Sequence, residues 1–560
     1  MIPFRRLAQR LHVCLLGLAS GTLLAAAPPK IERLEPASLQ PGRTNLLTLI
    51  GKDLGSLDHA WMLDDFVCDI LPATSDAEGD RQRTLSIVVP ADAPVGATAL
   101  RVMSPGGVSD VHVMWVDDLP GQTVRGRPHS PEAAQEIVPP VALEGRLASL
   151  HSDFFRFHAR AGQVLSLEAW AARIGSETDP LVRLLTLSGR EVFYMDDAPA
   201  RSGELAFRHR FEAEGDYLLE LRDATHRGGR TSTYRLRVAD VPLVGPTFPP
   251  SLDAEASSLA LLGPAAAETR SMRQRLIALR PEGSGWNLNV ALEDSGLRGQ
   301  TWVPRSPYPC RVERETDDSP EEAGEMALPV RLQGRLREAG DRDWYRLVVD
   351  EAHAGQTVEL KARTRELGSP CDLWMEWRSE EGRTLKRLAQ DEEASGVMTN
   401  RFKTAGTYVL MVEELNRQGG DDHVYEVDVR WLEPGFGAAV DSDVVNLRHG
   451  VTGRIKVQLD REGYEGPVRF ELTEVPAMLE LVNPRAEAGA KEAELEIQLA
   501  PQVGPGSLLE FGLVAHAEEG SGLAPRRVGT VPALKKRFRE AQAYPPNLEG
   551  RILLAVLPAE

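Results

Sequence analysis

Residues 143–147 read Leu-Glu-Gly-Arg-Leu, and the pattern returns at 332–336 as Leu-Gln-Gly-Arg-Leu. A second matching pair follows, Asp-Phe-Phe-Arg-Phe at 153–157 and Asp-Trp-Tyr-Arg-Leu at 343–347. The offset between the copies is 189 residues for the first pair and 190 residues for the second. Self-similarity at a nearly constant offset indicates that one structural unit occurs twice in the chain.

The repeat continues in the same order over nearly 100 residues. The further matched positions are Ala161-Gly162-Gln163 with Ala354-Gly355-Gln356, Gly189-Arg190 with Gly382-Arg383, Gly215 and Tyr217 with Gly406 and Tyr408, Gly228-Gly229 with Gly419-Gly420, and Tyr234 with Tyr425. Short runs between these glycines alternate apolar and polar residues, as in Val164-Leu-Ser-Leu-Glu-Ala169. Such runs, separated by glycine turns, predict an antiparallel β-sandwich for each copy.

The repeated motifs resemble the bacterial pre-peptidase C-terminal (PPC) domain, which has a D-W-Y strand, an A-G-Q turn, a D-x-L segment and a G-x-Y strand. The second copy matches with Asp343-Trp344-Tyr345, Ala354-Gly355-Gln356, Cys371-Asp372-Leu373 and Gly406-Thr407-Tyr408; the first copy is looser. The resemblance covers 130–242 and 325–432, and it implies two jelly-roll-like sandwiches.

A different kind of unit precedes each copy. Residues 28–120 contain Pro36, a Pro-Gly turn and the segment Ser104-Pro-Gly-Gly-Val-Ser109, and they resemble an IPT/TIG immunoglobulin-like domain. Pro249-Pro-Ser-Leu252 echoes the opening of that unit, so 243–324 is interpreted as a degenerate copy that ends in an acidic linker. Residues 264–324 depart most from the pattern, and the best helix candidate of the chain, Arg270–Leu279, lies there.

The last part of the chain also alternates apolar and polar residues. Residues 436–530 are predicted to form a further immunoglobulin-like sandwich, and 531–560 a basic segment and tail in which 552–557 add one edge strand. The predicted fold class is therefore all-β, with tandem antiparallel β-sandwiches arranged like beads on a string. This layout resembles secreted multidomain proteins of Planctomycetes-type bacteria.

The N-terminus predicts export. Arg5, Arg6 and Arg10 precede a mostly apolar run from Leu11 to Leu24, and three alanines follow at 25–27. This order is typical of a secretory signal peptide, here 1–27, and the apolar run is too short to span a bilayer comfortably. We therefore expect a periplasmic, cell-surface or extracellular protein that does not span the membrane after cleavage.

Charge and cysteine content limit the partners and the covalent chemistry. The 560 residues carry a net charge of −19, and no lysine occurs between Lys52 and Lys361, which disfavours nucleic-acid binding. Beyond the signal peptide there are three cysteines, Cys68, Cys310 and Cys371. Cys310 and Cys371 either form one disulfide or stay unpaired like Cys68.

No catalytic motif stands out in the sequence. G-x-S-x-G, H-E-x-x-H and the phosphate-binding glycine loops do not occur. We therefore expect a protein that is not an enzyme, although a triad of scattered residues would leave no such motif.

Calcium is the one cofactor that the sequence suggests, and the alternative is that the acidic loops only solubilise the chain. The candidate ligands are the acidic residues of loops in the two copies, Asp196, Asp197, Asp391, Glu392, Asp421 and Asp422. The repeated Asp153 and Asp343 are interpreted as turn residues at the entry to a strand. Trp170, Trp302, Trp374 and Trp377 are candidates for a carbohydrate platform.

The function expected from these patterns is that of a secreted, non-catalytic binding or adhesion protein, which presents β-sandwiches to an extracellular or cell-envelope polymer or protein. Two alternatives stay open: an accessory region that works with a secreted peptidase or other hydrolase, and a structural component of the cell surface.

Overall fold

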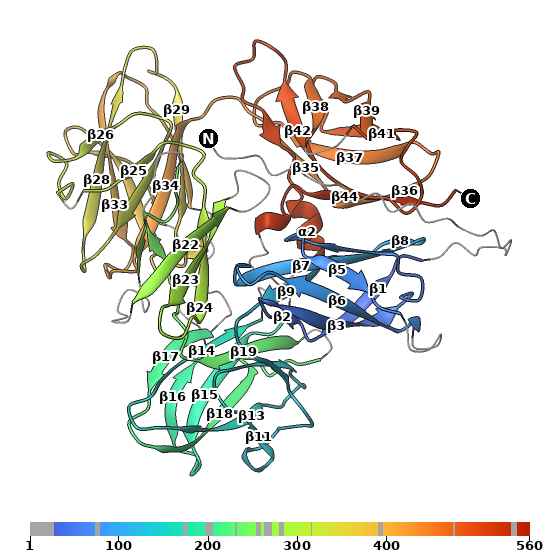
Figure 1. Cartoon of the computed structure of the whole chain (residues 1–560). Helices are drawn as coiled ribbons and strands as arrows, with labels where there is room; N and C mark the ends of the chain where they lie inside the picture. The colour runs from blue at the N-terminus through green and yellow to red at the C-terminus, as the bar shows by residue number, and fades with distance from the viewer. Residues whose placement is uncertain are drawn as a thin grey trace.

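The computed structural model shows a chain built almost entirely of β-strands, arranged as separate sheets (Figure 1). The predicted all-β fold of tandem sandwiches is confirmed. The residues that the structure describes are 27–72, 79–171, 176–196, 205–229, 232–253, 259–262, 271–278, 285–314, 316–389, 396–473, 477–538 and 546–559. The predicted signal peptide at 1–27 lies outside these residues except for its last position.

The first unit consists of two sheets around one core. One sheet has the order β1(Lys30–Glu35), β3(Arg43–Lys52), β6(Gln82–Val89), β5(Val67–Ile70). The other has the order β2(Ser38–Leu39), β9(His112–Val116), β7(Gly96–Ser104), β4(His59–Met62), with β8(Gly107–Val108) beside β7. Alternation along β3 places Leu47 and Leu49 in the core and Leu46 in solvent.

The two repeat copies have the same topology, strand for strand. In copy 1 the sheets are β10(Gly121–Thr123), β12(Val141–Arg146), β19(Thr233–Ala239), β14(Val164–Trp170), β17(Leu205–Arg210), and β11(Gln135–Glu136), β13(Asp153–Ala159), β18(Gly215–Asp223), β15(Pro180–Thr186), β16(Glu191–Met195). In copy 2 they are β25(Cys310–Val312), β27(Val330–Arg335), β34(Val424–Trp431), β29(Thr357–Arg363), β32(Val397–Arg401), and β26(Gly324–Met326), β28(Arg342–Val349), β33(Gly406–Glu414), β30(Leu373–Ser379), β31(Thr384–Ala389).

The first strand of each sheet in both copies adds a feature that the sequence analysis did not predict. β10, β11, β25 and β26 pair in parallel with their neighbours, whereas the other pairs are antiparallel. β10 and β25 begin at Gly121 and Cys310, before the starts of 130 and 325 expected for the two copies. The acidic stretch read as a linker therefore contributes strands to copy 2, and Asp317 within it is buried.

Between the copies lies a reduced unit. It has a short pair, β20(Thr247–Phe248) with β21(Ala260–Leu261), and one antiparallel sheet, β22(Met272–Ala278), β23(Gly285–Leu292), β24(Arg298–Pro304). The helix expected over Arg270–Leu279 is wrong, because β22 pairs with β23 along its whole length. Pairing with a neighbouring strand has overridden the helix propensity of this segment.

The last unit also has two sheets. One has the order β35(Gly437–Val440), β37(Gly453–Asp460), β41(Glu492–Leu499), β39(Leu479–Val482). The other has the order β36(Val444–Arg448), β44(Ile552–Leu557), β42(Leu508–Ala517), β38(Val468–Thr473), β40(Arg485–Ala486), with β43(Arg526–Arg527) beside β42. The edge strand expected at 552–557 is instead an inner strand, and all six of its residues are buried. The sheet therefore includes residues that were expected to form a tail.

The first and last units contact one another, which an arrangement of beads does not anticipate (Figure 1). Met103 and Val108 share an apolar cluster with Ala555 and Leu557. A second cluster joins the first unit to the helix α2(Val531–Arg537) through Leu534 and its neighbours. β44 therefore packs against the first unit, and α2 lies where the two units meet.

Candidate functional site

One contact explains three of the repeated residues. In copy 1 the Tyr234 hydroxyl donates a hydrogen bond of 2.6 Å to Oδ2 of the buried Asp153. The ring lies directly over Gly145, where a Cβ would come within 2.3 Å of the ring carbon Cζ. In copy 2 Tyr425 donates to Asp343 and lies over Gly334 in the same way. The repeated aspartates are therefore buried hydrogen-bond acceptors, not the turn residues that we expected.

Asp343 belongs to a cluster of acidic side chains at the start of β28. Carboxylate oxygens of Asp318, Asp341 and Asp343 all lie within 4.8 Å of one another. Asp318 is exposed, Asp341 half-buried and Asp343 buried. Three carboxylates at this spacing match the oxygen ligands that Ca²⁺ takes from proteins.

A fourth acid changes the electrostatics of this cluster. Burial raises the pKa of Asp343 well above its ordinary value, and the charge of Glu313 and a hydrogen bond between the two side chains raise it further. The hydrogen bond from Tyr425 opposes these effects without cancelling them. Asp343 therefore holds a proton more readily than an exposed aspartate, and a bound cation would compete with that proton.

The same three positions in copy 1 carry histidines in place of two aspartates. Backbone hydrogen bonds from Phe154 to Pro128 (2.7 Å) and from Trp344 to Asp317 (2.8 Å) align the two copies here. His129 therefore corresponds to Asp318, and His151 to Asp341. Nε2 of His129 lies 3.6 Å from Oδ1 of Asp153, and the centroids of the two imidazole rings are 4.4 Å apart.

Neither group was predicted from the sequence, because His129 and Asp318 lie more than 20 residues before the other two members of their groups. The calcium candidates expected from the sequence are arranged differently. Asp196 accepts a hydrogen bond of 2.8 Å from the Tyr194 hydroxyl. Oδ1 of Asp421 lies 3.8 Å from Nη1 of Arg335, and Oδ1 of Asp422 lies 3.1 Å from Nδ1 of His423. Asp197, Asp391 and Glu392 lie outside the described residues. The signal that could have found the cluster was Asp341-Arg-Asp343, two acids just before the Trp-Tyr strand.

The three cysteines are unpaired, and two of the four candidate tryptophans are buried. Cys68, Cys310 and Cys371 are free thiols, so the pairing of Cys310 with Cys371 is not formed. Burial raises the pKa of Cys68 to about 12 and that of Cys310 to about 11, so both stay protonated at neutral pH. Trp170 and Trp377 are buried, which removes them from a carbohydrate platform, whereas Trp302 is 39% exposed.

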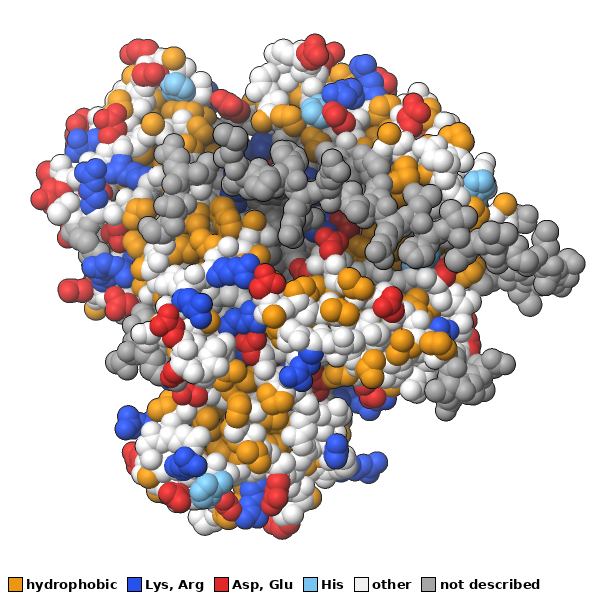
Figure 2. All heavy atoms as spheres, viewed as in Figure 1, with side chains coloured by type: hydrophobic (Ala, Val, Ile, Leu, Met, Phe, Trp, Pro, Cys, Tyr) orange, Lys and Arg blue, Asp and Glu red, His pale blue; other side chains and the backbone are white. Residues whose placement is uncertain are grey.

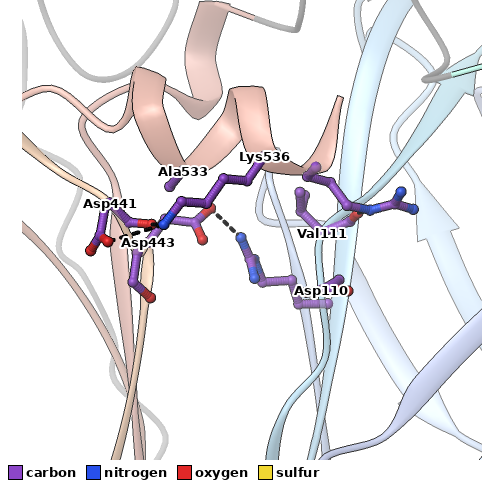
Figure 3. A pocket seen from close by; sticks show the side chains of 9 residues that line it. Asp110, Val111, Asp441, Asp443, Ala533 and Lys536 are labelled. Atoms are coloured by element: carbon purple, nitrogen blue, oxygen red, sulfur yellow. Dashed lines mark hydrogen bonds and ion pairs between the residues drawn. The ribbon is translucent and has the colours of Figure 1, made fainter. Parts of the chain in front are cut away.

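A polar pocket of about 230 Å³ lies between the first and last units. Asp110 and Val111 of the first unit face Asp441, Asp443 and Lys536 (Figure 3). Two ion pairs line it: Arg101 with Asp443, and Lys536 with Asp441 at 3.0 Å. Burial and the charges of Arg537 and Arg101 lower the pKa of nearby His112 to about 3, so this side chain is neutral. The ion pair of Arg101 with Asp443 joins the first unit to the last, whereas Asp441 and Lys536 both belong to the last part of the chain.

These features define a multidomain all-β protein with a cluster of three carboxylates in one repeat copy. No helix among the described residues has the length and apolar character needed to cross a bilayer. No protein-family model matches the chain, and no curated protein matches it. The PPC and IPT/TIG resemblances therefore rest on the sequence motifs alone.

Solved structures give partial similarities at low identity. A periplasmic inhibitor of g-type lysozyme, PliG from Aeromonas hydrophila, is 16% identical over 22% of this chain and 98% of its own, with a TM-score of 0.16. The M60 catalytic domain with two CBM51 domains from Clostridium perfringens ZmpB is 6% identical over 70% of this chain and 55% of its own, with a TM-score of 0.14. Fibronectin(III)-like modules of Clostridium thermocellum CbhA are 13% identical over 40% of this chain and 90% of their own, with a TM-score of 0.14. TM-scores this low carry no functional argument.

Proposed function

We propose that this protein is an exported, non-catalytic binding protein, whose β-sandwiches present fixed surfaces to an extracellular or cell-envelope polymer or protein. The sequence supports export through its N-terminal signal pattern. The PPC-like and IPT/TIG-like motifs support the same role, because such modules belong to secreted multidomain proteins.

The observation that carries the proposal is the fixed arrangement of the units. At the junction of the first unit with copy 1, Asp117 is fully buried and accepts hydrogen bonds from Arg235 at 2.7 Å and Arg237 at 3.1 Å. The rings of Trp115 and Trp170 meet there at 3.8 Å. Surfaces already held in place do not have to be ordered when a partner binds, so more of the contact energy appears as affinity.

The first unit offers a specific face for such a partner. Val67 and Val88 are directly opposite one another on β5 and β6, and they are 63% and 43% exposed. Leu46 on the adjacent β3 is 60% exposed. Figure 2 shows hydrophobic side chains over this unit among acidic and basic ones. Exposed apolar side chains gathered on one sheet face are a common feature of interaction sites.

The test is retention of the chain from residue 28 onward on insoluble polysaccharides, collagen-like protein and cell-envelope fractions, with calcium and with chelator. We expect retention on one matrix, and loss of retention in the double variant Val67→Glu, Val88→Glu. Leu187→Glu is the matched control, because Leu187 is 52% exposed on copy 1.

Passage through every matrix would refute the proposed binding role. Passage combined with concentration-dependent self-association would favour the structural alternative. Equal retention of the double variant and the control would show that the binding surface does not lie on the β5–β6 face.

A further inference from the structure

The side chains of His129, His151 and Asp153 converge at the start of β13. Asp153 is buried, and Tyr234 occupies its Oδ2 atom, so Oδ1 is the oxygen that faces His129. His129 is partly buried and His151 is exposed, so the group is open to solvent on one side.

The distance between His129 and Asp153 fits two ligands of one metal ion. Nitrogen and oxygen ligands lie about 2.0–2.1 Å from tetrahedral Zn²⁺, which places two of them about 3.3 Å apart. Nε2 of His129 and Oδ1 of Asp153 are 3.6 Å apart. This separation is longer than a normal hydrogen bond and within the range of an ion pair, so the two side chains are close enough to share a cation.

The hydrogen bond of His151 is a second, independent indication. Its Nδ1 lies 2.8 Å from the carbonyl oxygen of Ser149, and a carbonyl can only accept, so Nδ1 carries the proton. In the neutral ring Nε2 is then unprotonated and able to bind a metal. Histidines that bind metals in proteins typically donate their other ring N–H in this way, often to a backbone carbonyl.

From this geometry we propose that His129, His151 and Asp153 bind a divalent transition-metal ion of the zinc class. Imidazole nitrogens favour zinc, whereas the all-carboxylate group at the same positions of copy 2 favours hard cations such as calcium or magnesium. Among the described residues only the copy 2 group has all its ligand atoms within 4.8 Å, so binding in copy 1 includes a movement of the exposed His151 side chain. This inference does not depend on the proposed binding role.

The first test is isothermal titration calorimetry with zinc chloride. The protein is the chain from residue 28 onward, treated with chelator and desalted beforehand. His129→Ala and His151→Ala should each weaken zinc binding by at least about 100-fold, since even partners of metal ligands contribute 10- to 100-fold. His449→Ala is the matched control, because His449 lies in the last unit, away from copy 1. Its zinc affinity should equal that of the unchanged chain.

A second measurement identifies the ligands directly. Cobalt(II) in a tetrahedral site that contains imidazole gives a visible absorption spectrum, which should appear with the unchanged chain and disappear in the double variant His129→Asp, His151→Asp. That variant copies the side chains of copy 2, and both positions have solvent access, so it should stay folded. Equal zinc affinity in the alanine variants and the control, or no zinc binding by the unchanged chain, would overturn the proposal.

Discussion

Copy 1 and copy 2 share every strand pairing of their two sheets, yet two equivalent positions on the face that meets the preceding unit carry opposite charges. On β19 of copy 1 the residues at this face are Arg235 and Arg237. At the equivalent positions on β34 of copy 2 they are Glu426 and Asp428, and Arg331 supplies the positive partner.

Both junctions contain a serine from the preceding unit, although the charges differ. The Ser38 hydroxyl hydrogen-bonds with Glu144 and Arg235 of copy 1, and the Ser251 hydroxyl with Glu426 and Arg331 of copy 2. Ser38 and Ser251 are both buried. A hydroxyl can donate or accept, so it fits either arrangement of charges. The comparison shows that the serine contact is retained while the charges at two equivalent positions are reversed.

The largest expected effect comes from breaking the copy 1 junction with Asp117→Ala. It leaves Arg235 and Arg237 buried with one carboxylate partner each, and we expect a loss of about 3–5 kcal/mol in the free energy of unfolding. Urea unfolding followed by tryptophan fluorescence measures it, because Trp115 and Trp170 lie at this junction.

Glu426→Gln in copy 2 is the variant to compare with Asp117→Ala. Burial raises the pKa of Glu426 in spite of Arg331, and Arg331 keeps a bidentate contact with Asp428 at 2.6 and 2.9 Å. We therefore expect a loss of only about 1 kcal/mol. Equal losses in the two variants would show that the charge reversal has no energetic consequence.

Two buried aspartates, Asp343 of copy 2 and Asp117 of the first unit at the copy 1 junction, should respond differently to pH. The pKa of Asp343 is raised, so its stabilising contribution is present below the unfolded value of 3.8 and is lost as the pH rises through the folded pKa. Burial alone would raise the pKa of Asp117, but the charges of Arg237 and Arg235 outweigh it and lower the pKa. The contribution of Asp117 is therefore present above 3.8 and is lost as the pH falls.

Thermal unfolding of Asp343→Asn and Asp117→Asn between about pH 2 and pH 9 tests this contrast. Relative to the unchanged chain, Asp343→Asn should become more stable as the pH rises, by up to about 1.4 kcal/mol per pH unit. The deficit of Asp117→Asn should shrink toward the acid end of the range. Differences that stay constant with pH would contradict the assignment of these two groups.

The smallest effect concerns one turn that both copies share. Leu150 has φ of +63° in copy 1, and the equivalent Gly340 of copy 2 has φ of +83°. This left-handed conformation costs a residue with a side chain roughly 1–2 kcal/mol. We expect Leu150→Gly to stabilise the protein by about 0.5 kcal/mol, since glycine also has more entropy to lose, and Gly340→Ala to destabilise it by about 1 kcal/mol. Calorimetric melting should show midpoint shifts of opposite sign, and shifts of the same sign would contradict the equivalence of the two turns.

The repeat could be recognised from sequence because contacts fix its residues. Gly145 and Gly334 are required by the tyrosine rings that lie over them, and Gly228 and Gly419 by backbone atoms within 2.4 Å of a Cβ position. The strand at 552–557 was expected at an edge, although its unbroken apolar run is typical of a strand buried on both faces.

Other features could not be read in this way. Arginine and aspartate usually indicate a solvent-exposed surface, so the buried junction of Asp117 with Arg235 has no sequence signal. Met272–Ala278 contains good helix formers and forms a strand only because β23 lies beside it. The groups around Asp153 and Asp343 were missed for a similar reason, because turns distant in the chain bring their members together.

The inner position of β44 has a consequence for biosynthesis. A ribosome makes residues 552–557 last among the described strands, so the sheet of the last unit stays open until then. The cluster that joins Met103 and Val108 to Ala555 and Leu557 also waits for this strand. A chain that stops short of it leaves apolar surface uncovered on both the first and the last unit.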